Sequence, residues 1–433
     1  MKKFNIIVLL SALLVFTSCL FEQKDMFDKT PAERMDAFLK EYQTLLESSE
    51  NGWLLEYYPD SDLSYGGYVY FLTFSEGEVS ALFQLASDIS KPVKSLYMMT
   101  PDDGPILSFD TYNSYIHYFA TPSGGSDGYQ GYRGDTEFKI MGKSADNSEI
   151  YLVGRKSGNP CTLYRNEDYN PVEYLQACNA IRNELKYKSI VGYDFCVGDI
   201  TGEAESNGES QLNHVFYFGY PEDGSSEEDA VMIEGVFPFC TTPEGLKLFE
   251  PVEIDGSMYD FFYFDSQNNR FVSDDDYVSI NMKYTPVSEQ ITGYEWYISR
   301  SNLSSGAKEL FSQAETALAK NGDEIEYLAL GTTLNKGKTF GLQFKCKKGS
   351  GTFGMNTTPK EDDKVGLKYS MKGEGDQTKY LTSMRPIVNC FGLSKEKIFS
   401  IETDNFKAPT MIKLTDESDP TVTITLVTEK TAY

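Results

Sequence analysis

Short runs that alternate apolar and polar residues recur along most of this chain, and they constrain its fold more than any other feature. The clearest run, residues 421–427, places Val422, Ile424 and Leu426 on one face and threonines on the other. Such alternation is typical of a strand with one buried face. Because many such runs are separated by turn residues, we expect a mainly β fold with a few helices, its antiparallel sheets arranged as sandwiches or open barrels.

Strands are predicted wherever such runs lie between Gly- and Asn-rich breaks. They include 67–74, 114–119, 136–141, 149–154, 161–165, 213–220, 230–240, 246–254, 258–264, 277–284, 339–346, 351–356, 365–371, 398–403 and 410–415. The polar stretches 121–134, 201–211, 221–229 and 357–364 are predicted to be loops.

Three amphipathic helices introduce groups of these strands. The first begins at Thr30-Pro31-Ala32-Glu33, where the threonine suits the cap, the proline the first helical position and the glutamate a capping box. A second helix begins after Asn170 and a third after Ser304. We therefore expect three helix-led segments, 30–168, 169–301 and 302–433, the last of which can merge with the middle one.

The charge balance and the scarcity of histidine exclude several kinds of function. The 433 residues include 39 basic and 65 acidic side chains, a formal net charge of −26. A strongly acidic chain repels phosphate backbones, so nucleic acid is not an expected partner. His117 and His214 are the only histidines, which excludes a three-histidine zinc site within one chain. The sequence contains no P-loop and no dinucleotide-binding glycine motif, and we expect no cofactor.

The N-terminus has the features of a bacterial export signal. Two lysines precede an apolar run from Phe4 to Phe16, which is followed by Thr17-Ser18-Cys19. A basic start, a short apolar stretch and small residues define a signal peptide, and small residues directly before a cysteine resemble the bacterial lipobox. We expect residues 1–18 to be the signal peptide, Cys19 to carry the lipid, and 19–29 to form a tether. The alternative is an ordinary signal peptide that contains a cysteine.

Six further cysteines lie singly in the chain, without a C-x-x-C pair. Export permits disulfides, but the apolar surroundings favour buried free thiols at least as strongly. The sequence leaves this open.

Aromatic residues form two groups that are candidates for binding a ligand through their rings. Packing in sheet cores explains most such residues. The predicted strand 114–119 would place Tyr115, His117 and Phe119 on one face, where the histidine titrates near neutrality. The candidate ligand-binding residues are Trp53, Tyr57, Tyr58, Tyr112, Tyr115 and His117.

An acidic turn offers hard oxygen ligands for a cation such as calcium. Asp274, Asp275 and Asp276 are consecutive, and Asp265 lies nearby. The spacing is not that of an EF-hand, and a solvated acidic turn is the favoured explanation of the run. Paired carboxylates for glycoside hydrolysis cannot be picked out among 65 acids, and no catalytic residues are assigned.

Several strings resemble a Bacteroidetes outer-membrane lipoprotein family that is catalogued as a domain of unknown function. They are Pro31-Ala32-Glu33-Arg34, residues 51–59 (NGWLLEYYP), Asp103-Gly104-Pro105, residues 107–113 (LSFDTYN), His117-Tyr118-Phe119, residues 134–138 (GDTEF) and residues 238–246 (PFCTTPEGL). The family carries no assigned catalytic residues, so none is transferred.

The resemblance implies a nutrient-uptake context, with a TonB-dependent porin or a SusD-like lipoprotein as partner and the membrane contacted through the lipid anchor. The expected role is non-catalytic binding or assembly at the outer membrane or the cell surface. Two alternatives stay open: a surface hydrolase of glycan or peptide that uses unlocated carboxylates, and a structural envelope protein.

Overall fold

The computed structural model describes residues 29–122, 131–206, 212–222, 230–361 and 363–433. Contacts between residues divide the chain into two compact units. Unit 1 comprises residues up to Ala177 together with Pro238–Cys240, and unit 2 comprises Cys178–Phe237 and Thr241–Tyr433. Each unit is described by itself. Cys19 and the rest of the expected export signal lie outside the described residues.

Unit 1 begins with helix α2 (Pro31–Glu47), whose N-terminus has the predicted capping box. The Thr30 hydroxyl accepts the N–H of Glu33, and the Glu33 carboxylate accepts the N–H of Thr30. These bonds satisfy backbone donors that the first turn of a helix leaves free. The buried residues of α2 are Leu39, Tyr42 and Leu46, which recur at the spacing that places them on one face.

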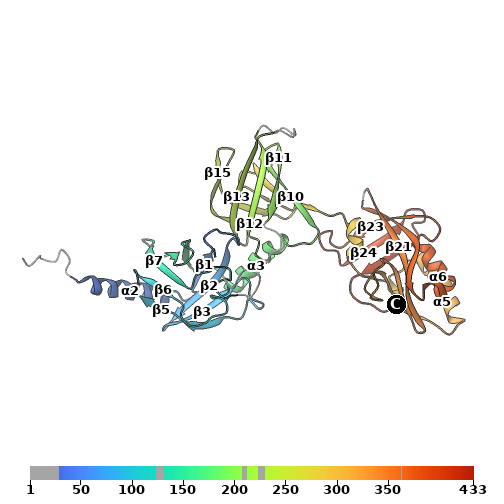
Figure 1. The fold of residues 1–433 in the computed structure, drawn as a ribbon, viewed down its shortest axis with the longest axis horizontal. Coiled ribbons are helices and arrows are strands. Elements are labelled where there is room, and N and C mark those ends of the chain that lie inside the picture. Colours follow the sequence, from blue (N-terminus) through green and yellow to red (C-terminus); the bar gives the residue numbers. More distant parts are fainter. Residues whose placement is uncertain (1–28, 123–130, 207–211, 223–229, 362) are drawn as a thin grey trace, which may run out of the picture. The chain divides into compact units, whose positions relative to one another are not determined.

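A nine-stranded antiparallel sheet follows α2 (Figure 1). Its spatial order is β4-β3-β2-β1-β9-β8-β7-β6-β5, so the first and last strands in sequence, β1 and β9, pair with each other near the middle. The strands are β1 (Trp53–Tyr57), β2 (Tyr68–Ser75), β3 (Glu78–Phe83), β4 (Val93–Leu96), β5 (Met98–Thr100), β6 (Ile106–Ser108), β7 (Glu137–Lys143), β8 (Glu149–Gly154) and β9 (Pro160–Arg165).

Helix α3 (Pro171–Glu184) leads into a closed eight-stranded barrel, the middle barrel. Strand β10 pairs with both β11 and β17, which closes the sheet on itself. Buried aromatic side chains fill the interior: Phe195 stacks on Phe218 with ring centroids 4.4 Å apart. The strands are β10 (Ile190–Val197), β11 (Ile200–Ser206), β12 (Val215–Pro221), β13 (Met232–Thr241), β14 (Gly245–Ile254), β15 (Ser257–Asp265), β16 (Arg270–Val272) and β17 (Val278–Tyr284).

A second closed eight-stranded barrel, the C-terminal barrel, completes unit 2. Its strands are β18 (Trp296–Tyr297), β19 (Ile325–Gly331), β20 (Gly341–Cys346), β21 (Gly349–Lys360), β22 (Lys364–Gly375), β23 (Lys397–Thr403), β24 (Met411–Asp416) and β25 (Thr423–Val427). Its helical elements are α4 (Val287–Gln290), the 3-10 turns η1 (Ile291–Gly293) and η2 (Arg300–Asn302), α5 (Ser305–Ala319) and α6 (Gln377–Cys390).

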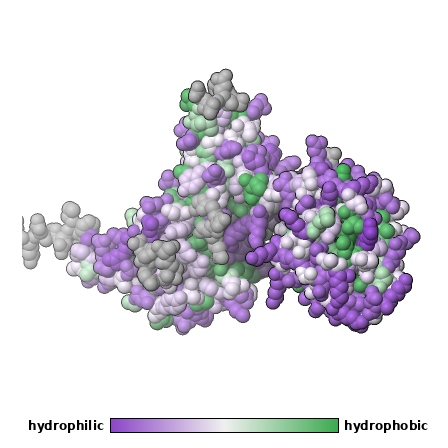
Figure 2. All heavy atoms as spheres, turned by 45° about the vertical axis from the view of Figure 1, so that its right-hand side comes forward, coloured by the Kyte–Doolittle hydropathy of each residue, from purple (hydrophilic) through white to green (hydrophobic). Residues whose placement is uncertain are grey.

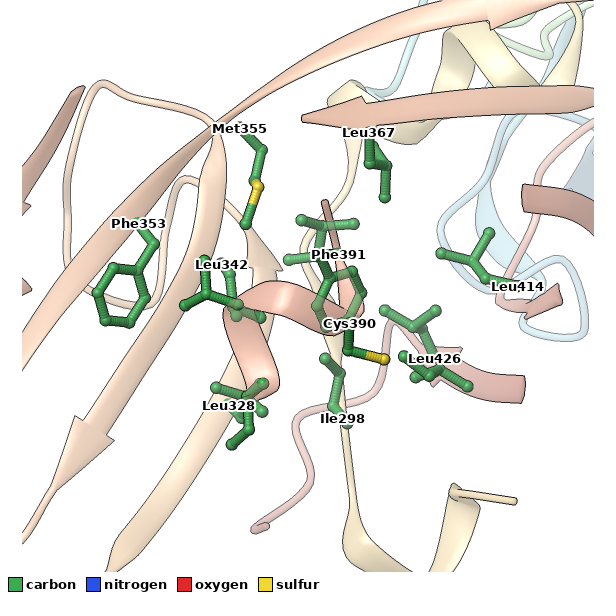
Figure 3. Close-up of a cluster of buried hydrophobic side chains, with 14 of the residues drawn as sticks. Ile298, Leu328, Leu342, Phe353, Met355, Leu367, Cys390, Phe391, Leu414 and Leu426 are labelled. Atoms are coloured by element: carbon green, nitrogen blue, oxygen red, sulfur yellow. The ribbon is translucent and has the colours of Figure 1, made fainter. Parts of the chain in front are cut away.

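The end of helix α6 lies in the core of the C-terminal barrel. Figure 3 shows Cys390 and Phe391 among strand side chains such as Leu342 and Leu426. All four side chains are fully buried. Helices α5 and α6 both contribute to this core, so the barrel holds helical residues where a ligand-binding barrel would have a cavity.

The prediction of a mainly β protein with antiparallel sheets and a few helices is confirmed, and the two barrels of unit 2 close completely. Three local predictions were wrong. In the predicted loop 357–364, residues 357–360 belong to strand β21 and Lys364 begins β22. Residues 114–119 form hydrogen-bonded turns, in which Asn113 and His117 carbonyls accept N–H groups four residues ahead. Within the predicted loop 201–211, residues up to Ser206 belong to strand β11.

All six cysteines after Cys19 are free thiols. Five are buried, and Cys196 is half-buried. Burial raises the pKa of Cys346 and of Cys390 to about 12, so these thiols stay protonated and unreactive at neutral pH.

Candidate functional site

The first group of aromatic candidates lies in the core of unit 1. Trp53 is fully buried; its indole N–H donates to the Leu46 carbonyl (2.9 Å), and the Arg165 guanidinium covers its ring at 4.8 Å. Tyr57 and Tyr58 are also buried. Each of these contacts joins parts of unit 1, and a ligand-binding role for the three residues stays a prediction.

The second group is brought together by the turns at 114–119. Tyr112 is exposed, and its ring lies 5.4 Å from that of His117. The N–H of Asn113 donates to His117 Nδ1 (3.3 Å), and burial lowers the pKa of this histidine, so that it is neutral at pH 7. Tyr115 turns away to donate to the Lys91 carbonyl (3.2 Å). A ligand-binding role for Tyr112, Tyr115 and His117 stays a prediction.

The acidic candidates for a metal are engaged with protein donors. Arg270 bridges Asp265 (3.2 Å) and Asp276 (2.8 Å). Asp275 accepts from Ser273, from the N–H of Tyr277 and from the Tyr259 hydroxyl, while Asp274 is exposed. Within the described ranges, no three His, Cys, Asp or Glu side chains gather in a way that could hold a metal. A metal role for this turn stays a prediction.

A groove on the middle barrel is the hollow that we take as the candidate site; we call it the α3–β10 groove. Its volume, about 910 Å³, is at the upper end of the range of about 300–1,000 Å³ typical of small-molecule sites. It is lined by Leu185, Lys186, Tyr187, Lys188, Ile190, Val191, Gly192, Tyr193, Glu203, Ala204, Glu205, Ser206, Asn213 and Lys283.

Local irregularity of the strands opens this groove. The pairing of β10 with β17 shifts register between Ile190 and Gly192, as in a β-bulge, which bends a strand away from its neighbour. Gly192 adds room, because a Cβ there would stand only 3.2 Å from Lys283 Cε. The chain from the end of α3 to β10 supplies one wall, and β11 and β17 supply others.

The groove contains three lysines in different electrostatic settings. Lys283 is paired with Asp194 (2.8 Å), and Lys188 is exposed. Lys186 is half-buried and has neither an ion pair nor a side-chain hydrogen bond with any described residue. Burial, and next the charge of Arg182, lower its pKa to about 8.

The polar lining of the groove combines donors and acceptors. Glu203 and Glu205 on β11 are exposed acceptors, and Glu203 lies close enough to Lys283 to interact with it electrostatically. Asn213 is buried and donates to Ser206 Oγ (3.3 Å). Figure 2 shows many hydrophilic residues, among paler and hydrophobic ones, on the face of the molecule in view.

Sequence reasoning missed this groove because its lining comes from four separate stretches of chain. Lysines are common just after a helix, because their charge complements the helix dipole. Lys186 and Lys188 therefore gave no indication of a binding site. The register shift at Gly192 depends on a pairing with residues more than 80 positions away, which no local pattern reveals.

The fold and the groove together define a mainly β protein with two closed barrels and a polar, solute-sized hollow on one of them. The chain belongs to the family described as "Domain of unknown function (DUF4302)", whose model matches residues 23–266. This stretch covers the described part of unit 1 and most of the middle barrel.

Other comparisons add no argument about function. No curated protein matches the chain. Among solved structures, the chain is similar to the DNA polymerase III beta chain of Streptococcus pneumoniae TIGR4 at 10% identity, over 90% of this chain and 97% of that one, with a TM-score of 0.10. The H. pylori beta clamp is 7% identical over 92% and 98%, with a TM-score of 0.12. Such low TM-scores support neither a common fold nor a common activity.

Proposed function

We propose that this protein is a lipid-anchored lipoprotein of the bacterial outer membrane that binds a small solute as an accessory to nutrient uptake, without catalysing a reaction. The anchor rests on the sequence around Cys19. The family itself has no known function. No helix among the described residues is long and apolar enough to cross a membrane.

The observation that carries the binding role is the α3–β10 groove. Its volume of about 910 Å³ and its convergent polar groups suit a small solute. A purely structural envelope protein has no need of such a hollow, and the groove therefore favours binding over the structural alternative.

The state of the carboxyl groups favours binding over the hydrolase alternative. A glycosidase needs one acid with a raised pKa to protonate the leaving group. Wherever a described Asp or Glu departs clearly from its ordinary pKa, the shift is downward; the pKa of Asp265 and of Asp404, for example, falls to about 2. Buried Asp135 accepts two backbone N–H groups and the Tyr57 hydroxyl, which is the bonding of a structural carboxylate.

The test is recovery of the native protein from gently solubilised outer membranes, compared with a Cys19→Ser variant. We expect the native chain in the membrane fraction, together with a TonB-dependent porin or a SusD-like lipoprotein in near-stoichiometric amount, and the variant in the soluble fraction. Recovery of the native chain alone, under conditions that keep porin complexes intact, would overturn the accessory role. A variant that stays on the membrane would overturn the anchor.

A further inference from the structure

Lys186 is exceptional among the less exposed lysines of this chain. Lys407, Lys397 and Lys143 have side chains that are 13%, 17% and 27% exposed, and each is paired with a carboxylate. Pairing is expected, because acids outnumber bases by 65 to 39, and because a desolvated charge is costly without a counter-ion. A half-buried lysine without a counter-ion among the described residues, at the wall of a solute-sized groove, has the electrostatics of an anion-binding site.

The neighbours of Lys186 strengthen this reading. Arg182, on the preceding turn of α3, adds positive charge. The nearest acid in sequence, Glu184, is occupied by Lys407 (2.6 Å). Lys283, also in the lining, is held by Asp194. Lys186 is thus the half-buried groove lysine whose ammonium group has no ion pair with a described residue.

The remaining lining narrows the class of ligand. Glu203 and Glu205 accept hydrogen bonds, Asn213 and Ser206 have side chains of both polarities, and Tyr187 offers a ring and a hydroxyl. Exposed carboxylate acceptors such as Glu203 and Glu205 suit hydroxyl donors. A molecule with one carboxylate and several hydroxyl groups suits this lining, because the carboxylate can pair with Lys186 and the hydroxyl groups can donate to the acceptors.

We infer that the α3–β10 groove binds a small hydroxylated carboxylate, such as a sugar acid, whose carboxylate pairs with the ammonium group of Lys186. This inference names the ligand class of the proposed binding function and rests on it. The ammonium form is required, and it is lost as the pH rises through about 8. The other titratable groups that line the groove are Lys188, Lys283, Glu203, Glu205, Tyr187 and Tyr193. Arg182 acts on Lys186 through its charge.

The sign of the pH dependence follows from the lowered pKa. The affinity is nearly full at about pH 7, about half of that at pH 8 and about tenfold lower at pH 9, because only the protonated fraction binds. Tyr193 does not contribute to this pH dependence, since burial raises its pKa to about 12 and its hydroxyl stays protonated between pH 7 and pH 9. The carboxylate in turn stabilises the ammonium form, so ligand binding raises the pKa of Lys186 and takes up protons near pH 9.

The experiment uses the full chain, purified in detergent, with its lysines labelled as ¹³C-dimethylamines so that Lys186 can be titrated by NMR. The probes are D-glucuronate and D-galacturonate, with D-glucose and D-galactose as matched neutral sugars. We expect at least one uronate, and neither neutral sugar, to raise the pKa of Lys186. We also expect calorimetry to show that uronate affinity falls about tenfold between about pH 7 and pH 9. No response to either uronate, or an equal response to the neutral sugars, would overturn the inference.

Two substitutions separate charge from packing. Lys186→Met keeps the aliphatic stem and removes the charge, and should lower uronate affinity at least tenfold at pH 7. Lys308→Met, an exposed position on α5 outside the groove, should leave it unchanged. Lys186→Arg should retain binding and hold it beyond pH 9, which also covers the case in which Lys186→Met fails to fold. Unaltered binding by Lys186→Met would overturn the inference, whatever the membrane pull-down shows.

Discussion

Single buried charges in this protein depend on specific partners, and Asp416 at the end of β24 is the clearest example. Its side chain is fully buried, and its carboxylate accepts hydrogen bonds from Lys397 Nζ and from the N–H (2.9 Å) and hydroxyl (2.6 Å) of Ser418. Burial alone would raise the pKa of Asp416, but these hydrogen bonds outweigh it and leave the pKa below its ordinary value of 3.8.

Replacing Asp416 by Asn removes the counter-charge of Lys397, whose side chain is only 17% exposed. We expect the free energy of unfolding of the C-terminal barrel to fall by about 3–5 kcal/mol, as when one member of a buried ion pair is removed. Urea denaturation at pH 7 measures the change. The control is Glu402→Gln, whose partner Lys413 is 41% exposed and which should cost less than about 1 kcal/mol. Equal losses in the two variants would contradict the prediction.

The same pair gives a pH dependence of stability. A carboxylate whose pKa is lowered by folding contributes stability above its unfolded pKa, near 3.8, and the contribution disappears as the pH falls through the lower folded value. We expect the native protein to lose stability below about pH 3.9 more steeply than Asp416→Asn does. Parallel curves for the two proteins in this acid range would show that Asp416 does not contribute.

At the scale of elements, helix α5 is tied to the barrel through its cap. Ser304 Oγ accepts the N–H of Ala307 and, from β25, the N–H of Thr423 (2.8 Å), and it donates to the Thr421 carbonyl (2.6 Å). One hydroxyl therefore serves the helix and the last strand together, whereas the Thr30 cap of α2 serves its own helix.

Ser304→Ala should destabilise the C-terminal barrel by about 1–2 kcal/mol, the upper part of the range for lost N-caps, because it also leaves strand groups unpaired. Thr30→Ala should cost about 1 kcal/mol or less, since its cap is exposed. Chemical denaturation measures both changes. A larger loss from Thr30→Ala would contradict the view that the bond to β25 matters.

The irregular pairing of β21 with β22, whose register shifts between Phe353 and Met355, depends on glycine. A Cβ at Gly354 would collide with the Lys372 carbonyl oxygen and approach Ser370 Oγ at 2.7 Å. Gly354→Ala should therefore destabilise the barrel by about 1–3 kcal/mol. Gly293→Ala, where no neighbouring atom lies within 4 Å, should change stability by less than about 0.5 kcal/mol. Thermal unfolding of the two variants compares them, and indistinguishable midpoints would contradict the prediction.

The elements that could be predicted from sequence are those with local signals. The caps at Thr30, Asn170 and Ser304 predicted the starts of α2, α3 and α5, because a cap is a short-range hydrogen bond. Helix α6 was not predicted, since it contains Pro386, which normally ends a helix. Residues 114–119 alternate like a strand, yet bonds from Asn113 and His117 close turns there.

The candidate site could not be predicted from the sequence for a different reason. The predicted aromatic residues were identifiable by type, but whether a ring is buried depends on packing against distant strands, as for Trp53. The groove depends on the pairing of β10 with β17. Lys186 is significant because no described carboxylate forms an ion pair with it, which only the folded structure reveals.

For the molecule as a whole, the two compact units provide a natural test of independence. The chain has two tryptophans, Trp53 in unit 1 and Trp296 in the C-terminal barrel, and both are fully buried. Each therefore reports the packing of its own unit. Large multi-unit chains commonly unfold in more than one step.

Single-tryptophan variants make the test direct. In Trp53→Phe the fluorescence comes from Trp296, and in Trp296→Phe it comes from Trp53. We expect different urea midpoints by fluorescence for the two reporters, and two steps in a probe of the whole chain such as circular dichroism. Coincident midpoints, in variants of equal overall stability, would show that the units unfold together.

The six free cysteines have a consequence for how this chain matures. Under the export that we propose, the chain would meet an oxidising environment with every thiol exposed before it folds. Five of these thiols end inside packed cores, so the native state is reached only if burial outpaces oxidation. Folding therefore competes with thiol oxidation, and once the protein is folded its buried thiols are protected from oxidation. A substitution that slows folding would therefore act as a redox mutation as well, because it lengthens the time in which wrong disulfides form.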